Sequence, residues 1–332
     1  MNDYQLNPDL FADDAKQEPI RAGFGRGLKA AGETNEAVIA LCADLTDSTQ
    51  MSLFKEAFPN RFVEVGVAEQ NLVTLGSGFA RAGKIPFVSS YASFSPGRNW
   101  EQIRTTISLN NQPVKIVGSH AGLYTGADGA THQMLEDITL MRVLPNMVVV
   151  VPGDSLEAEK ATKLLAENGR PSYLRLAREK TPIISTDESP FEIGKAYVLR
   201  EGTDVSLMGT GTMTYELLAA ANILAEQGIN AEVVHVPTIK PLDDVTIIAS
   251  SRKTGRVLTA EEGQIKGGFG GAVAELLSEQ LPTPLKLVGM QDRFGESGKP
   301  AELLDYFGLT AEKIAVTTKE FVEKTAQYHR EY

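Results

Sequence analysis

The 332-residue chain is longer than one typical hydrophobic core requires, so about two domains are expected. Its formal charge of −11 argues against general binding to nucleic acids or to anionic membranes, although it permits a local basic pocket for a phosphorylated small molecule. The single cysteine, Cys42, excludes an intramolecular disulfide. The polar, acidic N-terminus shows no signal peptide, and the longest strongly apolar run, Met147 to Val151, is far too short to span a membrane. A soluble cytoplasmic protein is therefore expected.

Strand and helix patterns alternate along the first half of the chain. Residues 1–18 are polar and acidic and are expected to form an arm or a frayed start, before a helix over Ile20–Ala31. Short apolar runs predict the strands Ala37–Cys42, Phe62–Val67, Ile85–Tyr91, Val114–Ser119, Met147–Pro152 and Ser172–Ala177. Helical spacing predicts helices over Ala68–Ala82, Asn99–Leu109 and Leu156–Glu167. Continuous apolar strands that alternate with helices indicate a parallel sheet covered on both faces.

A second α/β pattern follows a proline-rich polar stretch, Thr181–Pro190, which is interpreted as the linker. The predicted strands are Asp204–Gly209, Ala231–Val236, Arg256–Ala260 and Leu285–Met290. Two glycine clusters, GTGTM and GGFGG, are expected to open helices through tight turns rather than to bind a nucleotide, because neither has the GxGxxG spacing with its acidic residue. We therefore expect an α/β fold with domains at 1–185 and 186–332, each a mostly parallel sheet with helices on both faces.

Glu69 lies where a predicted strand ends and a helix begins, in the stretch RFVEVGVAEQN. Open α/β sheets bind their ligands at such carboxyl ends of strands. A carboxylate in this place can also do no more than favour the positive end of a helix dipole. Glu69 is therefore a candidate functional residue whose role depends on its neighbours.

Two further clusters also follow strand ends. Tyr91 and Phe94 come at the end of one strand, and the glycine-rich stretch SHAGLYTGADGATHQMLED follows the next. This loop holds His120, Asp128 and His132, which include two of the chain's four histidines and so favour a functional role. A zinc site is weakly indicated, because the His–Asp–His spacing lies in a loop and no fourth ligand is evident. A serine hydrolase is also weakly indicated, since no GxSxG motif is present.

These motifs occur in one order and at one spacing: VGVAEQ, the YxxF pair, the HAG…GADGATHQ loop, LPNMVVVVP and PSYLRLAR. Together they resemble the pyrimidine-binding and C-terminal domains of transketolase, a thiamine-diphosphate enzyme. The resemblance covers nearly the whole chain, and after residue 190 it depends on features such as IKPLD. Transketolases bind the diphosphate and its metal through a GDG motif in a further N-terminal domain, and this sequence has no GDG. The resemblance therefore implies the C-terminal subunit of a split transketolase. A separate partner chain would hold the diphosphate and the Mg²⁺ or Ca²⁺, in a two-fold assembly that is expected to be a heterotetramer.

The resemblance assigns the cofactor side of the site to four residues. Glu69 matches the glutamate that hydrogen-bonds the aminopyrimidine ring and supports the proton transfer that activates the cofactor. A glutamate buried between chains should have a raised pKa, which suits that role. Phe94 matches the aromatic residue that stacks on the pyrimidine, Tyr91 a second ring of that pocket, and Asp44 an aspartate near the thiazolium. Gly97 stands where many transketolases have a third aromatic residue.

The resemblance assigns the substrate side to the remaining candidates. His132 matches a histidine beside the reactive carbon, and Asp128 matches a residue that reads a sugar hydroxyl. The sugar phosphate would be held by a group of four residues, His120, Arg178, Arg21 and Ser48. Two arginines and a hydroxyl suit a phosphate dianion, because a guanidinium binds it with two hydrogen bonds. No metal ligand is expected on this chain.

The activity implied is transfer of a two-carbon ketol unit from a ketose phosphate to an aldose phosphate. One alternative is the beta subunit of a 2-oxo-acid dehydrogenase decarboxylase component, which has similar domains and a separate partner chain. A second is 1-deoxyxylulose-5-phosphate synthase, which shares DGxTHQ but normally has an arginine at the position of His120. A third is a non-catalytic scaffold, against which the retained Glu69, Phe94, Asp128 and His132 argue.

Overall fold

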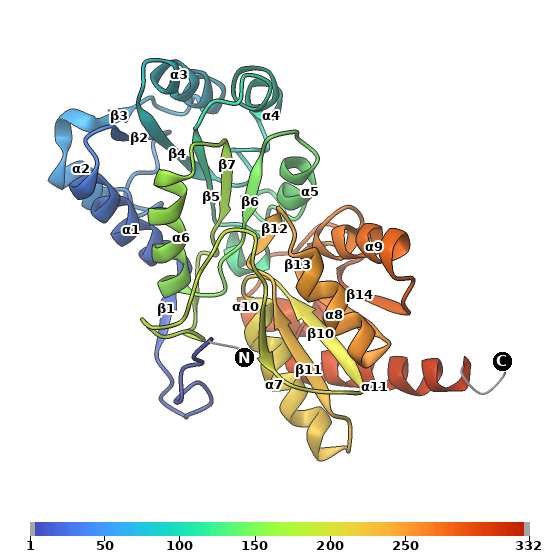
Figure 1. The fold of residues 1–332 in the computed structure, drawn as a ribbon. Helices are drawn as coiled ribbons and strands as arrows, with labels where there is room; N and C mark the ends of the chain where they lie inside the picture. The colour runs from blue at the N-terminus through green and yellow to red at the C-terminus, as the bar shows by residue number, and fades with distance from the viewer. Residues whose placement is uncertain (1–3, 329–332) are drawn as a thin grey trace.

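The computed structural model describes residues 4–328 and consists of two α/β units that lie side by side (Figure 1). The larger sheet has seven strands in the order β12-β6-β7-β5-β4-β2-β3, and every neighbouring pair except β12–β6 is parallel. Its strands are β2 (Val38–Cys42), β3 (Phe62–Glu64), β4 (Ile85–Tyr91), β5 (Lys115–Ser119), β6 (Val148–Val150), β7 (Ser172–Arg175) and β12 (Thr238–Lys240).

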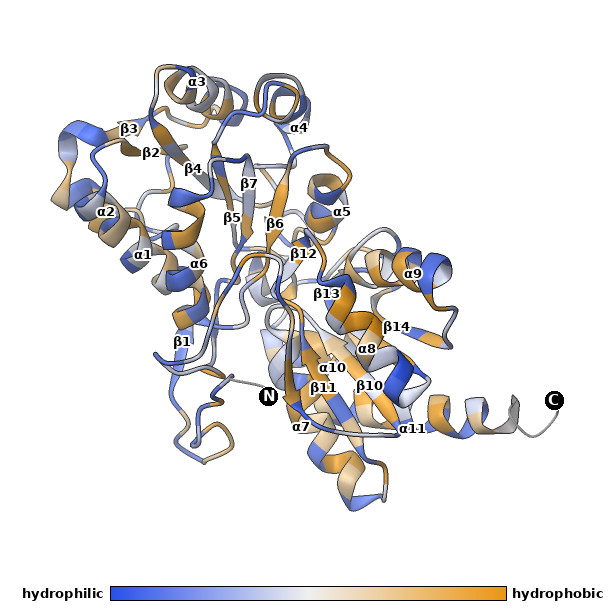
Figure 2. Ribbon diagram, in the orientation of Figure 1, coloured by the Kyte–Doolittle hydropathy of each residue, from blue (hydrophilic) through white to orange (hydrophobic). Residues whose placement is uncertain are grey.

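Helices cover both faces of this sheet, because side chains along each strand alternate between two apolar cores. On β2, Val38, Ala40 and Cys42 face one core, whereas Ile39 and Leu41 face the other. The first core is closed by α1 (Ile20–Thr34), α2 (Ser52–Ala57) and α6 (Ser155–Glu167). The second core is closed by α3 (Glu69–Arg81), the helical segment α4 (Trp100–Gln102) with the π-helical turn η2 (Ile103–Ser108), and α5 (Asp137–Arg142). In Figure 2 the hydrophobic residues are concentrated on the strands and on the inner sides of these helices.

The second sheet has five strands in the order β14-β13-β10-β11-β9, parallel except for β9 against β11. They are β9 (Tyr197–Arg200), β10 (Val205–Gly209), β11 (Ala231–His235), β13 (Val257–Gln264) and β14 (Leu285–Met290). One face is covered by α7 (Met213–Glu226), α10 (Pro300–Phe307) and α11 (Ala311–Tyr328), and the other by α8 (Asp244–Thr254) and α9 (Phe269–Gln280). Two mostly parallel sheets with helices on both faces confirm the predicted fold class. No helix within residues 4–328 combines the length and the apolar character needed to cross a membrane.

Both glycine clusters open helices, as predicted. GTGTM leads into α7 and GGFGG into α9. At the second cluster the buried Glu261 carboxylate accepts hydrogen bonds from the backbone N–H groups of Phe269 and Gly270, each at 2.8 Å. A Cβ on Gly268 would lie 2.1 Å from that carboxylate, so only glycine fits there. Burial raises the pKa of Glu261 to about 7.

Two predicted elements differ in the structure. The strand predicted over Phe62–Val67 ends at Glu64, because Gly66 turns the chain with φ +69 and donates its N–H to the Glu64 side chain at 3.1 Å. The helix predicted over Asn99–Leu109 contains only a short α-helical segment, which continues as the π-helical turn. At both places side chains hydrogen-bond to the backbone, Glu64 with Gly66 and Thr106 with the backbone oxygen of Gln102, and such bonds compete with regular structure.

The N-terminal stretch is not a frayed arm over the part that the structure describes, whereas residues 1–3 lie outside it. Tyr4 and Leu10 are buried. The side chain of Asn7 donates to the backbone oxygen of Ile183 at 2.9 Å, and β1 (Gln17–Pro19) pairs antiparallel with β8 (Lys180–Pro182). Polar composition concealed these contacts because they are made with residues far along the chain.

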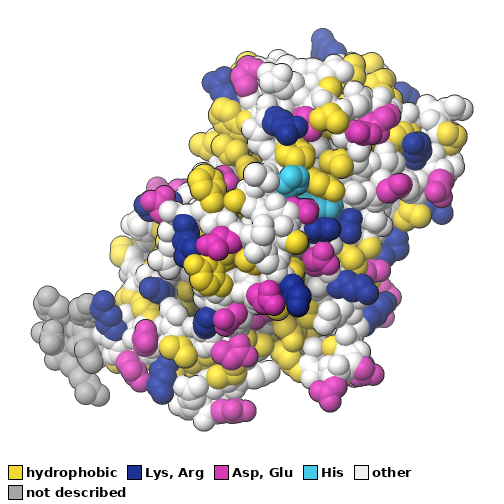
Figure 3. All heavy atoms as spheres, turned by 180° about the vertical axis from the view of Figure 1, so that it is seen from behind, with side chains coloured by type: hydrophobic (Ala, Val, Ile, Leu, Met, Phe, Trp, Pro, Cys, Tyr) yellow, Lys and Arg dark blue, Asp and Glu magenta, His cyan; other side chains and the backbone are white. Residues whose placement is uncertain are grey.

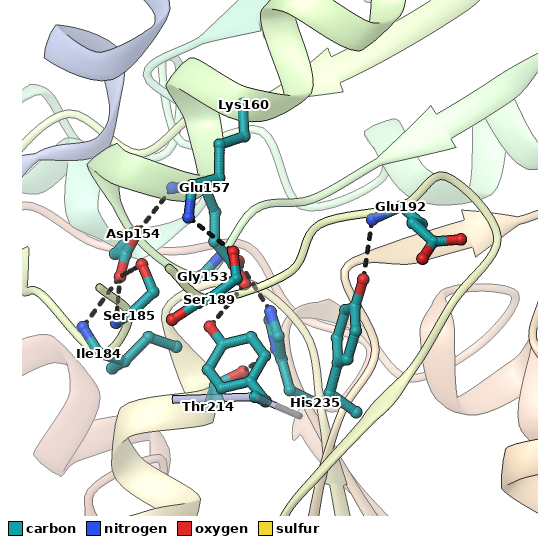
Figure 4. Close-up of polar contacts among 12 residues, drawn as sticks. Gly153, Asp154, Glu157, Lys160, Ile184, Ser185, Ser189, Glu192, Thr214 and His235 are labelled. Carbon is teal, nitrogen blue, oxygen red and sulfur yellow. Dashed lines mark hydrogen bonds and ion pairs between the residues drawn. The ribbon is translucent and has the colours of Figure 1, made fainter. Parts of the chain in front are cut away.

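The stretch interpreted as a linker is also packed rather than free. Asp154 accepts hydrogen bonds from the backbone N–H groups of Ile184 at 2.9 Å and Ser185 at 2.7 Å, and Lys160 donates to two carbonyls of the same stretch (Figure 4). In addition β12, which comes from beyond this stretch, completes the edge of the first sheet. The two units are therefore joined firmly.

A buried polar network fixes the units where they meet (Figure 4). Glu157 of α6 accepts from Tyr4 at 2.7 Å and contacts the ring Nε2 of His235 at 2.8 Å, and the other ring nitrogen of His235 contacts Thr214 at 2.6 Å. Burial acts to raise the pKa of Glu157, but the adjacent His235 outweighs it and holds that pKa below its usual value. The network joins the N-terminal stretch, the first unit and the second unit in one set of contacts.

Candidate active site

The carboxyl ends of β2, β4 and β5 meet at one edge of the larger sheet. The register pairs Tyr91 of β4 with Ser119 of β5, and Cys42 of β2 with Ser89 of β4. The loops that leave these ends therefore lie next to one another, which is where open α/β sheets bind ligands. Asp44, Tyr91 and the loop from His120 are the candidate residues that this edge brings together.

Four rings form a compact cluster at this edge. The ring centroids of Tyr91 and His120 are 3.7 Å apart and stacked, and those of Phe94 and His132 are 5.3 Å apart and edge-on. Tyr91 also lies 5.9 Å from Phe94 and 6.2 Å from His132. Residues that the sequence placed in two separate motifs thus share one wall of a site.

Glu69 opens α3 and is only 5 % exposed. Both of its carboxylate oxygens lie close to Nη1 of Arg98, at 3.2 and 3.3 Å. The guanidinium carbon of Arg98 stands 4.0 Å from the centroid of the Phe94 ring. Arg98 therefore links the two residues that were singled out for the cofactor. Sequence reasoning missed it, and its position four residues after Phe94 was the only available hint.

Gly97 is required by the local backbone. A Cβ at this position would lie 2.0 Å from the backbone oxygen of Ser93, a distance that no side chain can tolerate. An aromatic residue therefore cannot stand here without a different turn. The place beside Phe94 is filled instead by the side chain of Arg98.

The cationic part of the site is formed by Arg21 and Arg178, which come from opposite ends of the first unit. Figure 3, which views the molecule from behind, shows histidine atoms beside Lys and Arg side chains. Arg21 Nε donates to the backbone oxygen of Arg178 at 3.1 Å, and its Nη1 donates to the backbone oxygen of Ser48. Burial, and then the neighbouring Arg178, lower the pKa of Arg21. The positive charge of Arg178 thus acts on Arg21, and two neighbouring positive charges favour an anion beside them.

His120 stands behind the two arginines as a neutral ring. It is 2 % exposed, and its Nδ1 lies 2.9 Å from the Ser119 hydroxyl. Burial lowers the pKa of His120 to about 3, and the positive charges of Arg21 and Arg178 contribute in the same direction. At neutral pH the arginines therefore supply the positive charge, and His120 can supply only a hydrogen bond.

Asp128 lies at the exposed rim, with its carboxylate 3.3 Å from Nη1 of Arg178. The same Nη1 donates to the backbone oxygen of Thr125 at 2.9 Å, so Arg178 is tied to the loop that carries Asp128. His132, on the far side of this loop, is half-buried and has its Nδ1 2.8 Å from the Thr131 hydroxyl. The loop thus presents an acidic and an imidazole group beside the arginines.

Asp44 is exposed and has a positive φ of 59. Its backbone N–H donates to the Glu64 carboxylate at 2.7 Å, and the Thr46 hydroxyl donates to the same carboxylate at 3.1 Å. Glu64, which sequence reasoning did not single out, therefore shapes the loop that presents Asp44 and Ser48. The contacts of Asp44 are with Glu64 and not with the ring cluster.

The glycine-rich loop is held from behind by the second unit. The Glu262 carboxylate accepts from the backbone N–H of Tyr124 at 2.6 Å and from the Thr212 hydroxyl at 2.9 Å. The Gln133 side chain donates to the backbone oxygen of Glu296 at 2.8 Å. Sequence reasoning missed Glu262, because no local signal pairs it with a loop 138 residues earlier.

A second buried pair stiffens the same loop. Arg175 Nε donates to the Asp137 carboxylate at 3.0 Å, with side-chain exposures of 4 % and 1 %, and Nη2 donates to the backbone oxygen of Glu262 at 2.7 Å. The Tyr173 hydroxyl donates to Asp137 at 2.7 Å. A carboxylate in the interior is stable as an anion only when a cation and hydrogen-bond donors surround it, as Arg175 and Tyr173 do here. The pair therefore fixes the end of the loop against β7.

The arrangement fits a flat nitrogen heterocycle between the Phe94 ring and the Glu69 carboxylate, because a planar group with N–H donors, the guanidinium of Arg98, already makes both contacts. The donor set does not fit a metal. Within residues 4–328, no group of three or more His, Cys, Asp or Glu side chains could hold a metal ion.

Comparison with known proteins gives a consistent result. The family model of the transketolase pyrimidine-binding domain matches residues 16–183, and that of the transketolase C-terminal domain matches residues 194–314. The chain is 44 % identical over 308 residues to the transketolase C-terminal section of Methanocaldococcus jannaschii, covering 92 % of this chain and 96 % of that one. It is 41 % identical over 293 residues to a 6-deoxy-6-sulfo-D-fructose transketolase subunit of Clostridium sp. (strain MSTE9), covering 88 % and 91 %. Among solved structures, a split-gene transketolase described as an inactive beta4 tetramer has a TM-score of 0.86 at 43 % identity and covers 92 % of this chain and 98 % of that one.

Proposed function

The chain belongs to the transketolase family, and from that premise we propose that it is the catalytic C-terminal subunit of a two-chain, thiamine-diphosphate-dependent transketolase. It would take part in moving a two-carbon ketol unit from a ketose phosphate to an aldose phosphate. One observation carries the proposal: a buried carboxylate with an aromatic face beside it, and a pair of arginines, lie at the same edge of one sheet. The first two suit the cofactor ring, and the arginines suit the substrate anion.

On the cofactor side, the carboxylate of Glu69 would hold the aminopyrimidine ring by a charge-assisted hydrogen bond, and Phe94 would offer its ring face for stacking. When bound, thiamine diphosphate supplies the carbon nucleophile that takes up the ketol unit. Glu69, being buried, would keep its hydrogen bond away from competing water and so hold a proton at a fixed position on the ring. Tyr91 would close the pocket behind Phe94, and Asp44 is proposed on the thiazolium side.

On the substrate side, His132 stands next to the Phe94 ring and would contact hydroxyls near the reacting carbon. Asp128 at the rim would accept a hydrogen bond from a sugar hydroxyl, and Arg178 orients it. Arg21 and Arg178 would bind the terminal anion, and His120 and Ser48 would complete its hydrogen bonds. A neutral His120 serves this purpose because its ring can donate a hydrogen bond to an oxyanion without a change of protonation.

The terminal anion need not be a phosphate. One relative is a subunit that acts on a 6-deoxy-6-sulfo sugar, so a sulfonate is the second candidate for the arginine pair. Both groups are tetrahedral oxyanions that accept guanidinium hydrogen bonds, but a sulfonate carries a single charge and a phosphate carries about two at neutral pH. Kinetics with a sugar phosphate and its sulfonate analogue would separate the two. A markedly higher kcat/KM for the phosphate supports the first substrate class.

The diphosphate and its Mg²⁺ or Ca²⁺ would be held by a separate partner subunit, since this sequence has no GDG motif and no metal cluster within its described residues. A two-fold pair of these chains, each with one partner, is the proposed assembly, in the cytoplasm. The related split-gene chain, described as inactive when it forms a tetramer of its own kind, supports this division of labour.

The experiment is to purify this chain and assay ketol transfer with thiamine diphosphate and Mg²⁺, first alone and then with a partner chain that carries a GDG motif. We expect turnover only in the mixture. Robust turnover by the chain alone would refute the need for a partner, and no turnover in any mixture that forms a stable complex would refute the proposed activity.

A further inference from the structure

Arg98 makes both of the contacts that the proposed function reserves for the aminopyrimidine ring. Its guanidinium lies over the face of Phe94, 4.0 Å from the ring centroid, and its Nη1 lies 3.2 and 3.3 Å from the two oxygens of Glu69. The segment that carries it is anchored, because Asn99 donates to the backbone oxygen of Glu69 at 2.8 Å and to the Ser95 hydroxyl at 3.1 Å. These two anchoring contacts belong to Asn99, so the Arg98 side chain could leave Glu69 and Phe94 without breaking them.

The guanidinium group of Arg98 and an aminopyrimidine ring share the properties that are needed to bind between the Phe94 ring and the Glu69 carboxylate. Both are flat and delocalised, stack on an aromatic face, and present N–H donors at one edge to a carboxylate. The neighbouring residue Gly97 has no side chain that could compete with Arg98 for this space, and its backbone excludes a Cβ. The Arg98 side chain is 50 % exposed, whereas that of Glu69 is 5 % exposed, so only the arginine has solvent to move into.

We propose that Arg98 is an internal substitute for the cofactor ring. It occupies the aminopyrimidine position in the cofactor-free chain, neutralises the buried carboxylate of Glu69, and swings into solvent when thiamine diphosphate binds. This inference rests on the proposed function and deepens it, because it identifies the group that the cofactor must displace. The ion pair of a half-exposed arginine is weak. Arg98 can therefore pair with Glu69 in the free chain and still be displaced by the cofactor.

The apparent affinity for the cofactor equals the intrinsic affinity multiplied by the fraction of molecules in which Arg98 has left the site. Removing the guanidinium should therefore tighten binding by roughly 3- to 30-fold, the range expected for one weak ion pair combined with one cation–π contact. A residue that helped to hold the cofactor would show the opposite sign. The direction of the change is thus the decisive measurement.

The test uses the reconstituted two-subunit complex, stripped of cofactor and titrated with thiamine diphosphate at saturating Mg²⁺ in a calorimeter. Arg98→Met keeps the length of the side chain and removes the guanidinium. Arg104→Met, on the exposed side of the next turn, makes the same change of charge and serves as the control. We expect a lower Kd for Arg98→Met and an unchanged Kd for Arg104→Met. An equal or higher Kd for Arg98→Met would overturn the inference while leaving the proposed function intact.

Absence of cofactor binding by the wild-type complex would instead overturn the proposed function, and the inference with it. A second measurement needs neither cofactor nor partner. In the isolated chain, unfolding of Glu69→Gln, Arg98→Met and the double variant forms a double-mutant cycle. We expect the double variant to be more stable than the sum of the single effects implies. Strict additivity would show that Arg98 does not pair with Glu69 in solution, and would overturn the inference by itself.

Discussion

The two sides of the candidate site are supported in different ways. The Glu69 side is built from neighbouring segments of the first unit, and its outer parts are open: Val67 is 69 % exposed and Arg98 is half exposed. The His120 side is held from behind by the second unit, through Glu262 and the backbone of Glu296. This difference agrees with the proposed division of labour, in which the wall proposed for the substrate is supported within this chain and the wall proposed for the cofactor is left for a partner chain to complete.

The difference also gives the C-terminal unit a physical role. Glu262 and Arg175 place buried charges directly behind the glycine-rich loop, and these charges are stable only when both units are docked. Glycines at 122, 126 and 129 all have positive φ, so the loop has little intrinsic preference for its shape. The second unit therefore supplies the order that the loop sequence lacks.

The largest expected effect is on the substrate side. Asp137→Ala leaves the fully buried Arg175 without its carboxylate, which should lower the free energy of unfolding by about 3–5 kcal/mol. Glu33→Ala, which breaks the exposed pair with Lys29, should cost about 0–1 kcal/mol and is the control. Urea denaturation of the isolated chain measures both. A loss below about 1 kcal/mol in Asp137→Ala would mean that the loop is not held through this pair.

The next effect is on the cofactor side. Glu69→Gln keeps the shape of the side chain but removes its acid–base function, so turnover of the complex should fall by roughly 10²-fold or more. The melting temperature of the isolated chain should change little, because the lost contact is with a half-exposed arginine. Turnover is measured at saturating cofactor to separate chemistry from binding. Wild-type turnover would show that Glu69 is only a carboxylate at the end of a helix.

The sequence predicted where the strands and helices around the candidate site end better than it predicted what holds the glycine-rich loop in place. Apolar runs end at Tyr91 and Ser119, and Glu69 begins a helix, because local periodicity determines where strands and helices stop. The residues that hold the glycine-rich loop could not be predicted, because Glu262 and Tyr124 are 138 residues apart and no local sequence pattern links them. Composition even misled at the N-terminus, where a polar stretch hides the buried Tyr4. Arg98 was missed for another reason: the direction of a long side chain at a turn is decided by three-dimensional neighbours.

A smaller effect should distinguish recognition from folding on the substrate wall. Arg178→Ala removes one charge-assisted contact to the substrate anion, worth about 1.5–3 kcal/mol. This should lower kcat/KM for a sugar phosphate by about 10- to 150-fold. Efficiency with glycolaldehyde as acceptor should barely change, because that molecule has no group to reach the arginines. Equal losses with both acceptors would mean that Arg178 supports the loop through Thr125 and does not bind the anion.

The smallest effect tests whether the substrate wall really holds a neutral histidine. The pKa of His120 is lowered to about 3 in the folded chain, against about 6.5 in the unfolded chain. Its contribution to stability is therefore complete above about pH 6.5 and is lost as the pH falls toward 3. Between pH 7 and 5.5 the unfolded chain gains a proton that the folded chain does not, which costs about 1 kcal/mol. His120→Asn suits the comparison, because asparagine tolerates the positive φ of 56 at this position and does not titrate.

Denaturant unfolding at intervals of pH should therefore give a steeper loss of stability for the wild type than for His120→Asn below about pH 6.5. From pH 8 to 9 the two curves should run parallel, since His120 is neutral in both states there, and this range is the control. Parallel curves throughout would mean that His120 titrates alike in the folded and unfolded chains. The ring would then be charged beside Arg21 and Arg178 at acidic pH, and the anion site would strengthen on acidification instead of depending on the arginines alone.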